Sequence, residues 1–178
     1  MSTIGLALDT AELAQHYEHV SRDRQFEAGK ILVERLAFRS GERVLDVGSG
    51  TGLLAEYVAD IVGPVGTVLA IDPLPLRIEI AKRRSRANLT FSVGDAYELG
   101  RYADASFDVV YLNAVFHWLP EKLGPLREFH RLLASGGRLG ITTGAGERLG
   151  TLQAVRKAVL SRAPYARFPE SRDGVAHL

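Results

Sequence analysis

The sequence predicts a doubly wound, Rossmann-like α/β domain in which helices cover both faces of a mostly parallel sheet, giving three layers. From residue 43 onward, short and continuously apolar runs alternate with segments of helical periodicity. Continuous apolar strands are typical of parallel sheets that are buried on both faces. A glycine-rich turn, GSGTG, directly follows the first apolar run. The composition agrees, because 178 residues with 46% hydrophobic and 24% charged residues are typical of one soluble globular domain.

The elements follow in a regular order along the chain. Residues 10–20 and 21–38 have apolar residues at helical spacing, with Ser21 as a suitable N-cap, and these helices are expected to pack over the sheet. Five strands are then expected, at residues 43–47, 67–71, 89–93, 107–112 and 137–143. The expected helices between and after them lie at about 52–62, 74–87, 121–134 and 148–162.

Charge and residue usage exclude several classes of protein. Lys plus Arg number 22 against 21 for Asp plus Glu, so the net charge of +1 does not favour nucleic acid or an anionic membrane as a partner. The absence of cysteine excludes disulfides, zinc–thiolate sites and thiol nucleophiles, and no other ligand cluster suggests a metal. No apolar run approaches the ~18 residues of a membrane span, and the N-terminus lacks a leader pattern. A cytoplasmic location is therefore expected.

The glycine loop predicts a site for a nucleoside-bearing ligand. Gly48, Gly50 and Gly52 follow the first strand, where a turn into a helix requires positive φ and a ligand must approach the backbone. An alternative is that these glycines only make the turn. A dinucleotide loop requires G-x-G-x-x-G, but Leu53 stands at the third glycine position. Asp46, at the end of the strand, would repel a pyrophosphate and attract an ammonium group. A ligand with an amino-acid end therefore fits better than one with phosphates.

Polar residues follow each of the next three strands. Asp72 ends the second strand, where a carboxylate can bind both hydroxyls of a ribose. Asp95 follows the third strand, where it could accept a hydrogen bond from an adenine amino group beside the backbone of Ala96. Asn113 and Ala114 follow the fourth strand. Carboxyl ends of adjacent parallel strands meet at the ligand-binding edge of such sheets, so these residues are expected to form one site.

Five segments in order resemble the class I S-adenosylmethionine-dependent methyltransferases. They are VLDVGSGTG, VLAIDP, GDA, SFDVVYLNAVFHWLP and LREFHRLLASGGRLGIT, within residues 10–145. The resemblance is greatest to small-molecule enzymes such as the ubiquinone and menaquinone C-methyltransferases and natural-product O-methyltransferases. It implies one methyltransferase domain over residues 1–178, with a helical cover (1–40), a cofactor-binding core (41–145) and the start of a variable substrate-side segment (146–178).

The resemblance also implies roles for individual residues. The methionine part of S-adenosylmethionine would contact Asp46, Gly48, Ser49, Gly50 and Gly52. Asp72 would hold the ribose, with Pro73 and Leu74 beside the adenine, and Asp95 with Ala96 would bind the adenine amino group. Asn113, Ala114 and His117 would approach the methionine amino group and the reactive methyl, and Tyr17 would close over the cofactor from the helical cover.

One departure concerns the sheet. The family has seven strands, and its last two, which form an antiparallel hairpin, have no counterpart in this sequence. We therefore expect the chain to be a fragment or to lack these strands. Its oligomeric state is not predicted.

Methyl transfer from a sulfonium relies on alignment of the nucleophile and exclusion of water, so a catalytic base is optional. His117 is the best candidate for a base, and its alternative role is to orient or pack. The expected acceptor is a small, fairly apolar molecule with an oxygen, carbon or nitrogen nucleophile. The nucleobase motif [DN]-P-P-[YFW] is absent, and arsenite methylation, for which related enzymes use cysteines, is excluded by composition. The alternatives are a methyltransferase-like protein that binds the cofactor without transfer and a nicotinamide oxidoreductase.

Overall fold

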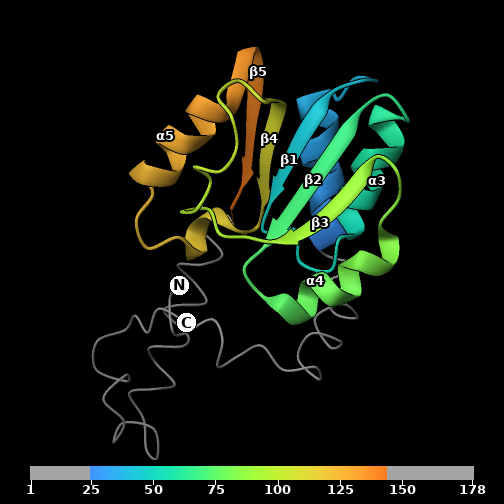
Figure 1. The fold of residues 1–178 in the computed structure, drawn as a ribbon, viewed down its shortest axis with the longest axis horizontal. Coiled ribbons are helices and arrows are strands. Elements are labelled where there is room, and N and C mark those ends of the chain that lie inside the picture. The colour runs from blue at the N-terminus through green and yellow to red at the C-terminus, as the bar shows by residue number, and fades with distance from the viewer. Residues whose placement is uncertain (1–24, 144–178) are drawn as a thin grey trace, which may run out of the picture. The chain divides into compact units, whose positions relative to one another are not determined.

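A five-stranded sheet with all strands parallel forms the centre of the molecule (Figure 1). The structure is a computed structural model and describes residues 25–143. The strands are β1 (Arg43–Val47), β2 (Thr67–Asp72), β3 (Leu89–Val93), β4 (Phe107–Asn113) and β5 (Leu133–Thr142), in the spatial order β3-β2-β1-β4-β5. All five predicted strands are confirmed, and the described residues up to Thr142 belong to one compact unit. The order reverses at β1, which places a topological switch point between β1 and β4.

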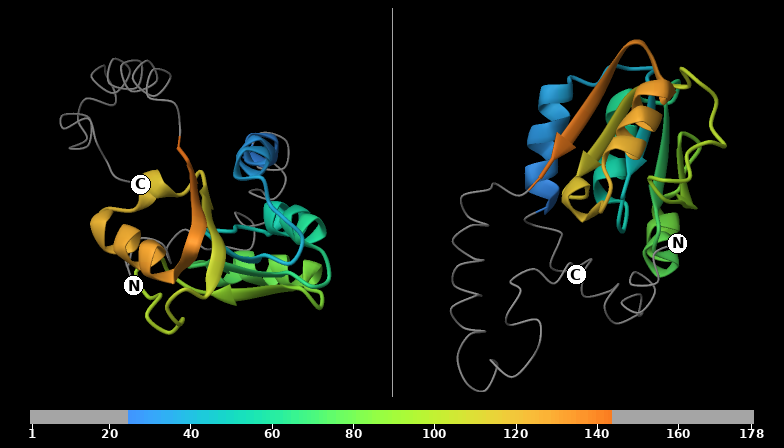
Figure 2. Two further views of the ribbon diagram at one scale, coloured as in Figure 1. Left: turned by 90° about the horizontal axis from the view of Figure 1, so that it is seen from above. Right: turned by 90° about the vertical axis from the view of Figure 1, so that its left-hand side faces the viewer.

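Helices cover both faces of this sheet, as the predicted three-layer architecture requires. A helix over residues 25–36, α3 (Leu53–Val62) and α4 (Pro75–Ala81) pack on one face. The other face is covered by α5 (Leu123–Leu132) and by the segment between β3 and β4. Figure 2 shows the helix over residues 25–36, called the first helix below because it is the first one described, and α3 on the side of the sheet opposite to α5. The predicted helices over 10–20 and 148–162 lie outside the described residues.

Two predicted boundaries are wrong. The helix expected over 74–87 ends at Ala81 and is followed by the short 3-10 turn η1 (Lys82–Arg84). It cannot continue to residue 87, because Ser85 is extended and Arg86 already pairs with Leu89. The last strand begins at Leu133 rather than 137, because α5 leads into it without a loop. An irregularity in the β4–β5 register, which moves from Phe107–Leu133 to Val109–Arg138, absorbs the extra residues.

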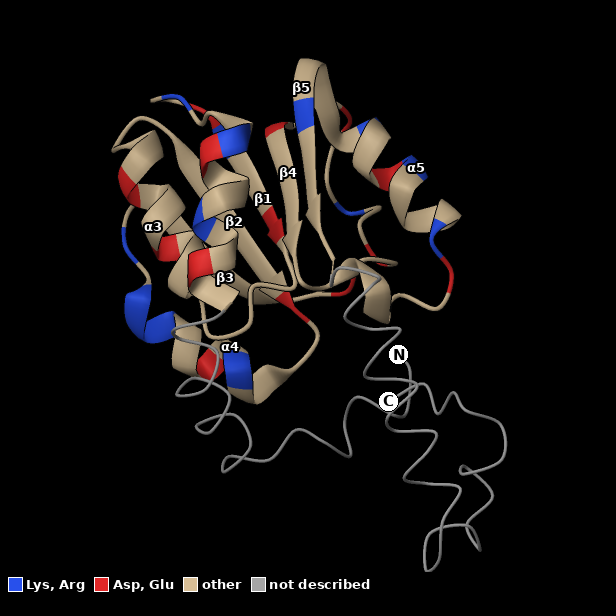
Figure 3. Ribbon diagram, turned by 180° about the vertical axis from the view of Figure 1, so that it is seen from behind, with Lys and Arg blue, Asp and Glu red and all other residues tan. Residues whose placement is uncertain are grey.

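Alternating side chains of the strands build the two halves of the core. In β1, Val44 joins the helices of the first face, whereas Leu45 and Val47 join the cluster under α5. Figure 3 shows charged residues mostly on helices and connections, with an acidic residue inside β1. This residue is Asp46, which is buried on the same face as Val44. The other core residues of β1 are apolar, so hydrophobic packing does not explain an acidic side chain in this central strand.

The helix over residues 25–36 is fixed at its C-terminal end by β5. The Arg138 side chain donates from Nε to the Leu36 carbonyl oxygen at 2.8 Å and from Nη2 to the Glu42 carboxylate at 2.8 Å. Gly140 of β5 has no side chain where Leu36 packs, since an added Cβ would lie 2.5 Å from Leu36 Cδ1. These contacts hold the helix so that its first residues reach the carboxyl edge of the sheet (Figure 2).

We expect Phe129→Ala to lower the free energy of unfolding by about 3–5 kcal/mol, because Phe129 of α5 is fully buried. Urea unfolding measures the change. His130→Ala, on the exposed side of the same helix, is the control and should change it by less than ~0.5 kcal/mol. Equal effects of the two substitutions would contradict the placement of Phe129 in the core cluster under α5.

Candidate functional site

The glycine loop connects β1 to α3 through three left-handed residues. Gly48, Gly50 and Gly52 have φ values of +83°, +57° and +86°. Packing adds a second requirement, because a Cβ on Gly48 would overlap Val115 and one on Gly52 would lie 2.6 Å from the Phe91 ring. The predicted conformational need for glycine is thus confirmed at all three positions.

Backbone and side-chain groups of β2 hold this loop in place. The N–H groups of Gly48 and Ser49 donate to the Ile71 carbonyl oxygen at 2.7 and 2.9 Å. Asp72, which is buried, accepts from the Gly50 N–H at 2.9 Å and from the Leu74 N–H at 3.0 Å. Asp72 therefore joins the glycine loop to the segment after β2. Each carboxylate oxygen can accept a second hydrogen bond, so the predicted contact with a ribose stays compatible with these bonds.

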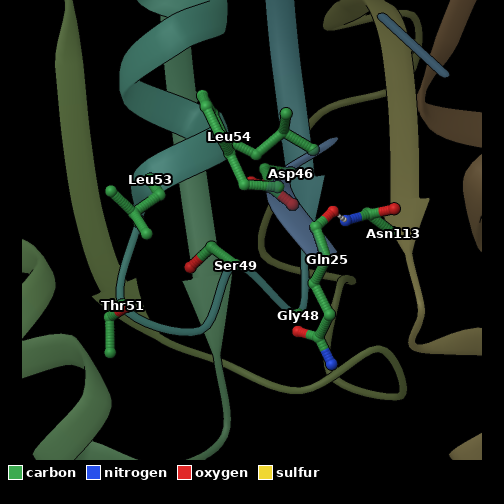
Figure 4. A pocket seen from close by; sticks show the side chains of 10 residues that line it. Gln25, Asp46, Gly48, Ser49, Thr51, Leu53, Leu54 and Asn113 are labelled. Atoms are coloured by element: carbon green, nitrogen blue, oxygen red, sulfur yellow. Dashed lines mark hydrogen bonds between the residues drawn. The ribbon is translucent and has the colours of Figure 1, made fainter. Parts of the chain in front are cut away.

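A pocket opens beside the glycine loop at the carboxyl ends of β1 and β4 (Figure 4). Five residues predicted for the cofactor site line it, namely Asp46, Gly48, Ser49, Gly52 and Asn113. Five further lining residues were not predicted, namely Gln25, Phe26, Thr51, Leu53 and Leu54. Thr51 lies between two of the glycines, and Leu53 and Leu54 follow the last one, so these three could have been found from that proximity. Gln25 and Phe26 reach the pocket only through the packing of their helix, which no local signal reveals.

The other predicted residues lie outside the lining of this pocket. Pro73 and Leu74 follow β2, and Asp95 follows β3, where its carboxylate accepts the Tyr97 N–H at 3.0 Å. Ala96 is buried, and Ala114 follows β4 with a φ of +58°. These residues follow β2, β3 and β4, and Asp72 is the last residue of β2, so all of them lie at the carboxyl ends of parallel strands and share the predicted edge of the sheet. Gly50 does not line the pocket either, and its N–H is held by Asp72. The roles of all these residues stay predictions, and Tyr17 lies outside the described residues.

Asp46 is the most unusual group of the pocket. Only 2% of its surface is exposed, and its Oδ2 accepts a hydrogen bond from the Tyr111 hydroxyl at 2.7 Å. Burial raises the pKa of the Asp46 carboxyl to about 7; the Tyr111 hydrogen bond lowers it, and the nearby Asp72 raises it further. A buried carboxyl without a cationic partner among the described residues is costly to keep ionised. A bound cation would remove that cost.

Ser49 is the second unusual polar group of the pocket. Its Oγ is buried and has no hydrogen-bond partner among the described residues. Buried hydroxyl groups in proteins are normally paired, so an unpaired one that lines a pocket favours a ligand with a polar group at that point. Asp46 and Ser49 together give the pocket an acid and a hydroxyl, which suit a ligand with a cationic group and a further polar group.

Asn113 connects three elements at the edge of the pocket. Its Nδ2 donates to the Gln25 carbonyl oxygen at 3.1 Å, and its Oδ1 accepts from the Thr142 hydroxyl at 2.7 Å. Thr142 also accepts the Ala114 N–H, at 3.0 Å on its Oγ1. Figure 4 shows the Gln25 side chain extending toward Gly48 from this anchor. The Asn113 amide thus positions the first helix rather than facing the pocket with unpaired atoms.

His117 lies in the 3-10 turn η2 (Phe116–Trp118) after β4 and is exposed. Its ring centroid is 4.9 Å from that of Trp118. Partial desolvation and the Lys122 ammonium lower the pKa of the His117 imidazole below its usual 6.5. The imidazole is therefore neutral at pH 7 and able to accept a proton, although it does not line the pocket.

Comparison with known proteins identifies the class to which this fold and loop belong. The methyltransferase domain family matches residues 45–141, which is more than half of the chain and includes β1 through β5. The chain belongs to this family of class I methyltransferase domains, whose methyl donor is S-adenosylmethionine.

Individual relatives give a finer comparison. An arsenite methyltransferase of Aquipseudomonas alcaligenes is 37% identical over 113 residues, which cover 58% of this chain and 33% of the relative. A demethylmenaquinone methyltransferase of Staphylococcus aureus is 32% identical over 131 residues, covering 70% of this chain and 54% of the relative. The chain thus spans between about a third and a half of the length of these curated relatives.

Solved structures agree on the fold. An S-adenosylmethionine-dependent methyltransferase from Aquifex aeolicus superposes with a TM-score of 0.64 at 24% identity, over 74% of this chain and 71% of that one. An arsenic(III) S-adenosylmethionine methyltransferase from Chlamydomonas reinhardtii gives a TM-score of 0.55 at 36% identity, over 58% of this chain and 39% of that one. The predicted class I methyltransferase fold is thereby confirmed.

Within residues 25–143, no helix has the length and apolar character needed to cross a membrane. The same residues contain no group of three or more His, Cys, Asp or Glu side chains arranged to hold a metal ion.

The raised pKa of Asp46 predicts a pH-dependent effect of Asp46→Asn on the cofactor-free protein. The folded state favours the neutral Asp46 carboxyl, whose pKa in the unfolded chain is near 4. The neutral carboxyl therefore stabilises the folded protein fully below pH 4, and this stabilisation is lost as the pH rises to about 7. Relative to wild type, the variant should gain roughly 2–3 kcal/mol of unfolding free energy between pH 5 and pH 8. Urea unfolding at the two pH values measures this gain.

Asp108→Asn is the matched control. The Arg43 guanidinium lowers the pKa of the Asp108 carboxyl, so this group is ionised at both pH 5 and pH 8. Its effect on stability should therefore be the same at the two pH values. An Asp46→Asn effect that is equally independent of pH would contradict the assignment of Asp46 as a buried, cation-seeking carboxyl.

Proposed function

We propose that this chain is the cofactor-binding core of an S-adenosylmethionine-dependent methyltransferase that acts on a small, fairly apolar acceptor. The observation that supports it most directly is the pair of buried polar side chains beside the glycine loop. Asp46 is a buried acid without a cationic partner, and Ser49 is a buried hydroxyl without any partner, within residues 25–143. The family membership supports the same cofactor.

The residue roles of the proposal come from the family resemblance and the position of each residue. Asp46 would bind the ammonium of the methionine end, and Ser49 with the backbone of the glycine loop would bind near its carboxylate. Asp72 would bind the ribose while it holds the loop, with Pro73 and Leu74 beside the adenine. Asp95 and Ala96 would contact the adenine amino group. Asn113, Ala114 and His117 would approach the methionine amino group and the reactive methyl, and Tyr17 would close over the cofactor.

When bound, the cofactor would supply a methyl group on a positively charged sulfonium: the acceptor's nucleophile would bond to the methyl carbon as the carbon–sulfur bond breaks, and the neutral thioether S-adenosylhomocysteine would leave. The protein's contribution is to hold the two reactants in line and to exclude water, which is worth up to ~7–11 kcal/mol in well-oriented systems. The glycine loop is suited to this role because β2 fixes three of its N–H groups. His117 is the candidate to accept a proton from an oxygen or nitrogen nucleophile, since its imidazole is neutral at pH 7.

The acceptor is proposed as a class and not as a compound. The relatives named above act on arsenite and on demethylmenaquinone, which are chemically unlike each other. A further relative, a protein-L-isoaspartate O-methyltransferase of Archaeoglobus fulgidus, is 38% identical over 118 residues. Similarity at this level therefore does not transfer an acceptor. Arsenite is disfavoured because none of these 178 residues is a cysteine.

Cofactor binding can be tested by thermal unfolding and calorimetry. S-adenosylmethionine should raise the Tm of the chain, because a ligand that binds only the folded state stabilises it. Ser49→Ala should leave the Tm without cofactor unchanged or slightly higher, since it removes an unpaired buried hydroxyl. The same variant should bind the cofactor roughly 3–10-fold more weakly, because a hydrogen bond is lost. A wild-type protein that shows no shift would refute the proposal.

Methyl transfer can be tested with methyl-labelled cofactor and a panel of small acceptors. Incorporation of label by wild type, with His117→Gln slower by about 10²–10⁴-fold and unchanged in cofactor affinity, is expected if His117 is the base. A loss below tenfold would assign His117 an orienting role. Cofactor binding without transfer to any acceptor would instead favour a binding protein that keeps the fold.

A further inference from the structure

Tyr111 of β4 is the direct neighbour of Asp46 across the sheet. The two residues are paired in the parallel register of β1 and β4, and both are buried. The Tyr111 ring packs edge-on against Phe38, with centroids 5.9 Å apart, which fixes the direction of the hydroxyl. That hydroxyl donates to Asp46 Oδ2 at 2.7 Å. A fully buried tyrosine thus directs its single polar atom at the central acid of the pocket.

The surroundings of Asp46 offer this acid little other support. Of the titratable groups among the described residues, those that act on it are Tyr111 from β4 and Asp72 from β2, and the latter is an acid. The pocket neighbours from the first helix and α3, Gln25 and Leu54, do not titrate. Asp46 Oδ1 accepts no hydrogen bond from residues 25–143. One oxygen is therefore held by the phenol, while the carboxyl also borders the pocket.

We propose that Tyr111 is a positioning residue, which keeps Asp46 charged and directed at the ammonium of the cofactor's amino-acid end. This inference rests on the proposed function, because it assumes that the pocket holds that end of S-adenosylmethionine. A phenol that donates to a carboxylate stabilises the charged form over the neutral acid. Tyr111 thereby opposes the burial and the Asp72 charge, both of which favour the neutral form.

The consequence is a pH dependence of cofactor affinity that Tyr111 controls. Where Asp46 is neutral, binding of an ammonium must first remove a proton, so affinity falls as pH drops below the pKa of about 7. Without the phenol, that pKa rises and the loss of affinity begins at a higher pH. At a pH well above the Asp46 pKa of both proteins, with and without the Tyr111 hydroxyl, the carboxyl is charged in each of them and their affinities for the cofactor converge.

Calorimetric titration of the chain with S-adenosylhomocysteine from pH 5.5 to 8.5 tests this inference. It compares wild type with Tyr111→Phe, which keeps the ring on Phe38. Tyr102→Phe is the matched control, because Tyr102 belongs to the cluster on the opposite face and packs on Phe107. 5′-Methylthioadenosine, which keeps the nucleoside and sulfur but lacks the amino-acid end, is the matched ligand.

The expected result is specific to pH and to the amino-acid end of the ligand. In Tyr111→Phe the midpoint of the pH profile should move upward by about one unit, which gives roughly tenfold weaker binding near pH 6 and about equal binding at pH 8.5. Tyr102→Phe should follow wild type. The affinity for 5′-methylthioadenosine should not depend on pH in this range in any of the three proteins.

Other outcomes overturn the inference. Weakening by the same factor at every pH would assign Tyr111 a structural role, and an unchanged profile would assign it none. If Tyr111→Phe does not fold, wild type and Asp46→Asn decide: S-adenosylhomocysteine affinity must depend on pH in wild type and lose that dependence in the variant. A wild-type protein that binds neither ligand at any pH contradicts the proposed function itself, which distinguishes that failure from a failure of the inference.

Discussion

The hydrogen bonds between the glycine loop and the end of β2 are the constraint on which the site depends. Ile71 and Asp72 accept three consecutive N–H groups of the loop, from Gly48 to Gly50. These bonds fix the left-handed turns that lead the chain from β1 into α3. Because β1 lies at the switch point of the sheet, the loop faces the gap where the connections diverge to opposite sides. The position of the pocket therefore follows from strand order and from these bonds together.

The electrostatics of the pocket follow from its depth. A carboxyl at the surface would be ionised and solvated, whereas Asp46 lies in the central strand, next to a phenol and near a second acid. This arrangement weakens the protein while no cation is bound and favours a ligand that brings one. The unpaired Ser49 hydroxyl has the same character on a smaller scale. Functional sites commonly retain such locally unfavourable groups, since the ligand satisfies them.

The edge of the pocket is built by parts of the chain that are far apart in sequence. Asn113 and Thr142 end neighbouring strands; the Thr142 hydroxyl donates to the Asn113 amide, and that amide donates to the carbonyl of Gln25 at the start of the described chain. Arg138 holds the other end of the same helix. The helix is thus attached to β4 and β5, although it covers the face of the sheet that α3 and α4 occupy. The pocket beside the glycine loop is therefore lined by Gln25 and Phe26 of this helix as well as by the loop.

The sequence alone determined the fold class, the five strands and the glycine loop with Asp46, because apolar periodicity and turn chemistry are local properties. Half of the pocket lining was predictable, because ligand sites of parallel sheets lie where strands end. These residues are Asp46, Gly48, Ser49, Gly52 and Asn113. Gln25 and Phe26 were not predictable, since only the packing of their helix on β5 brings them to the loop. The partner of Asp46 was equally hidden. Tyr111 reads as an ordinary strand residue, and only the pairing of β1 with β4 places its hydroxyl on the buried acid.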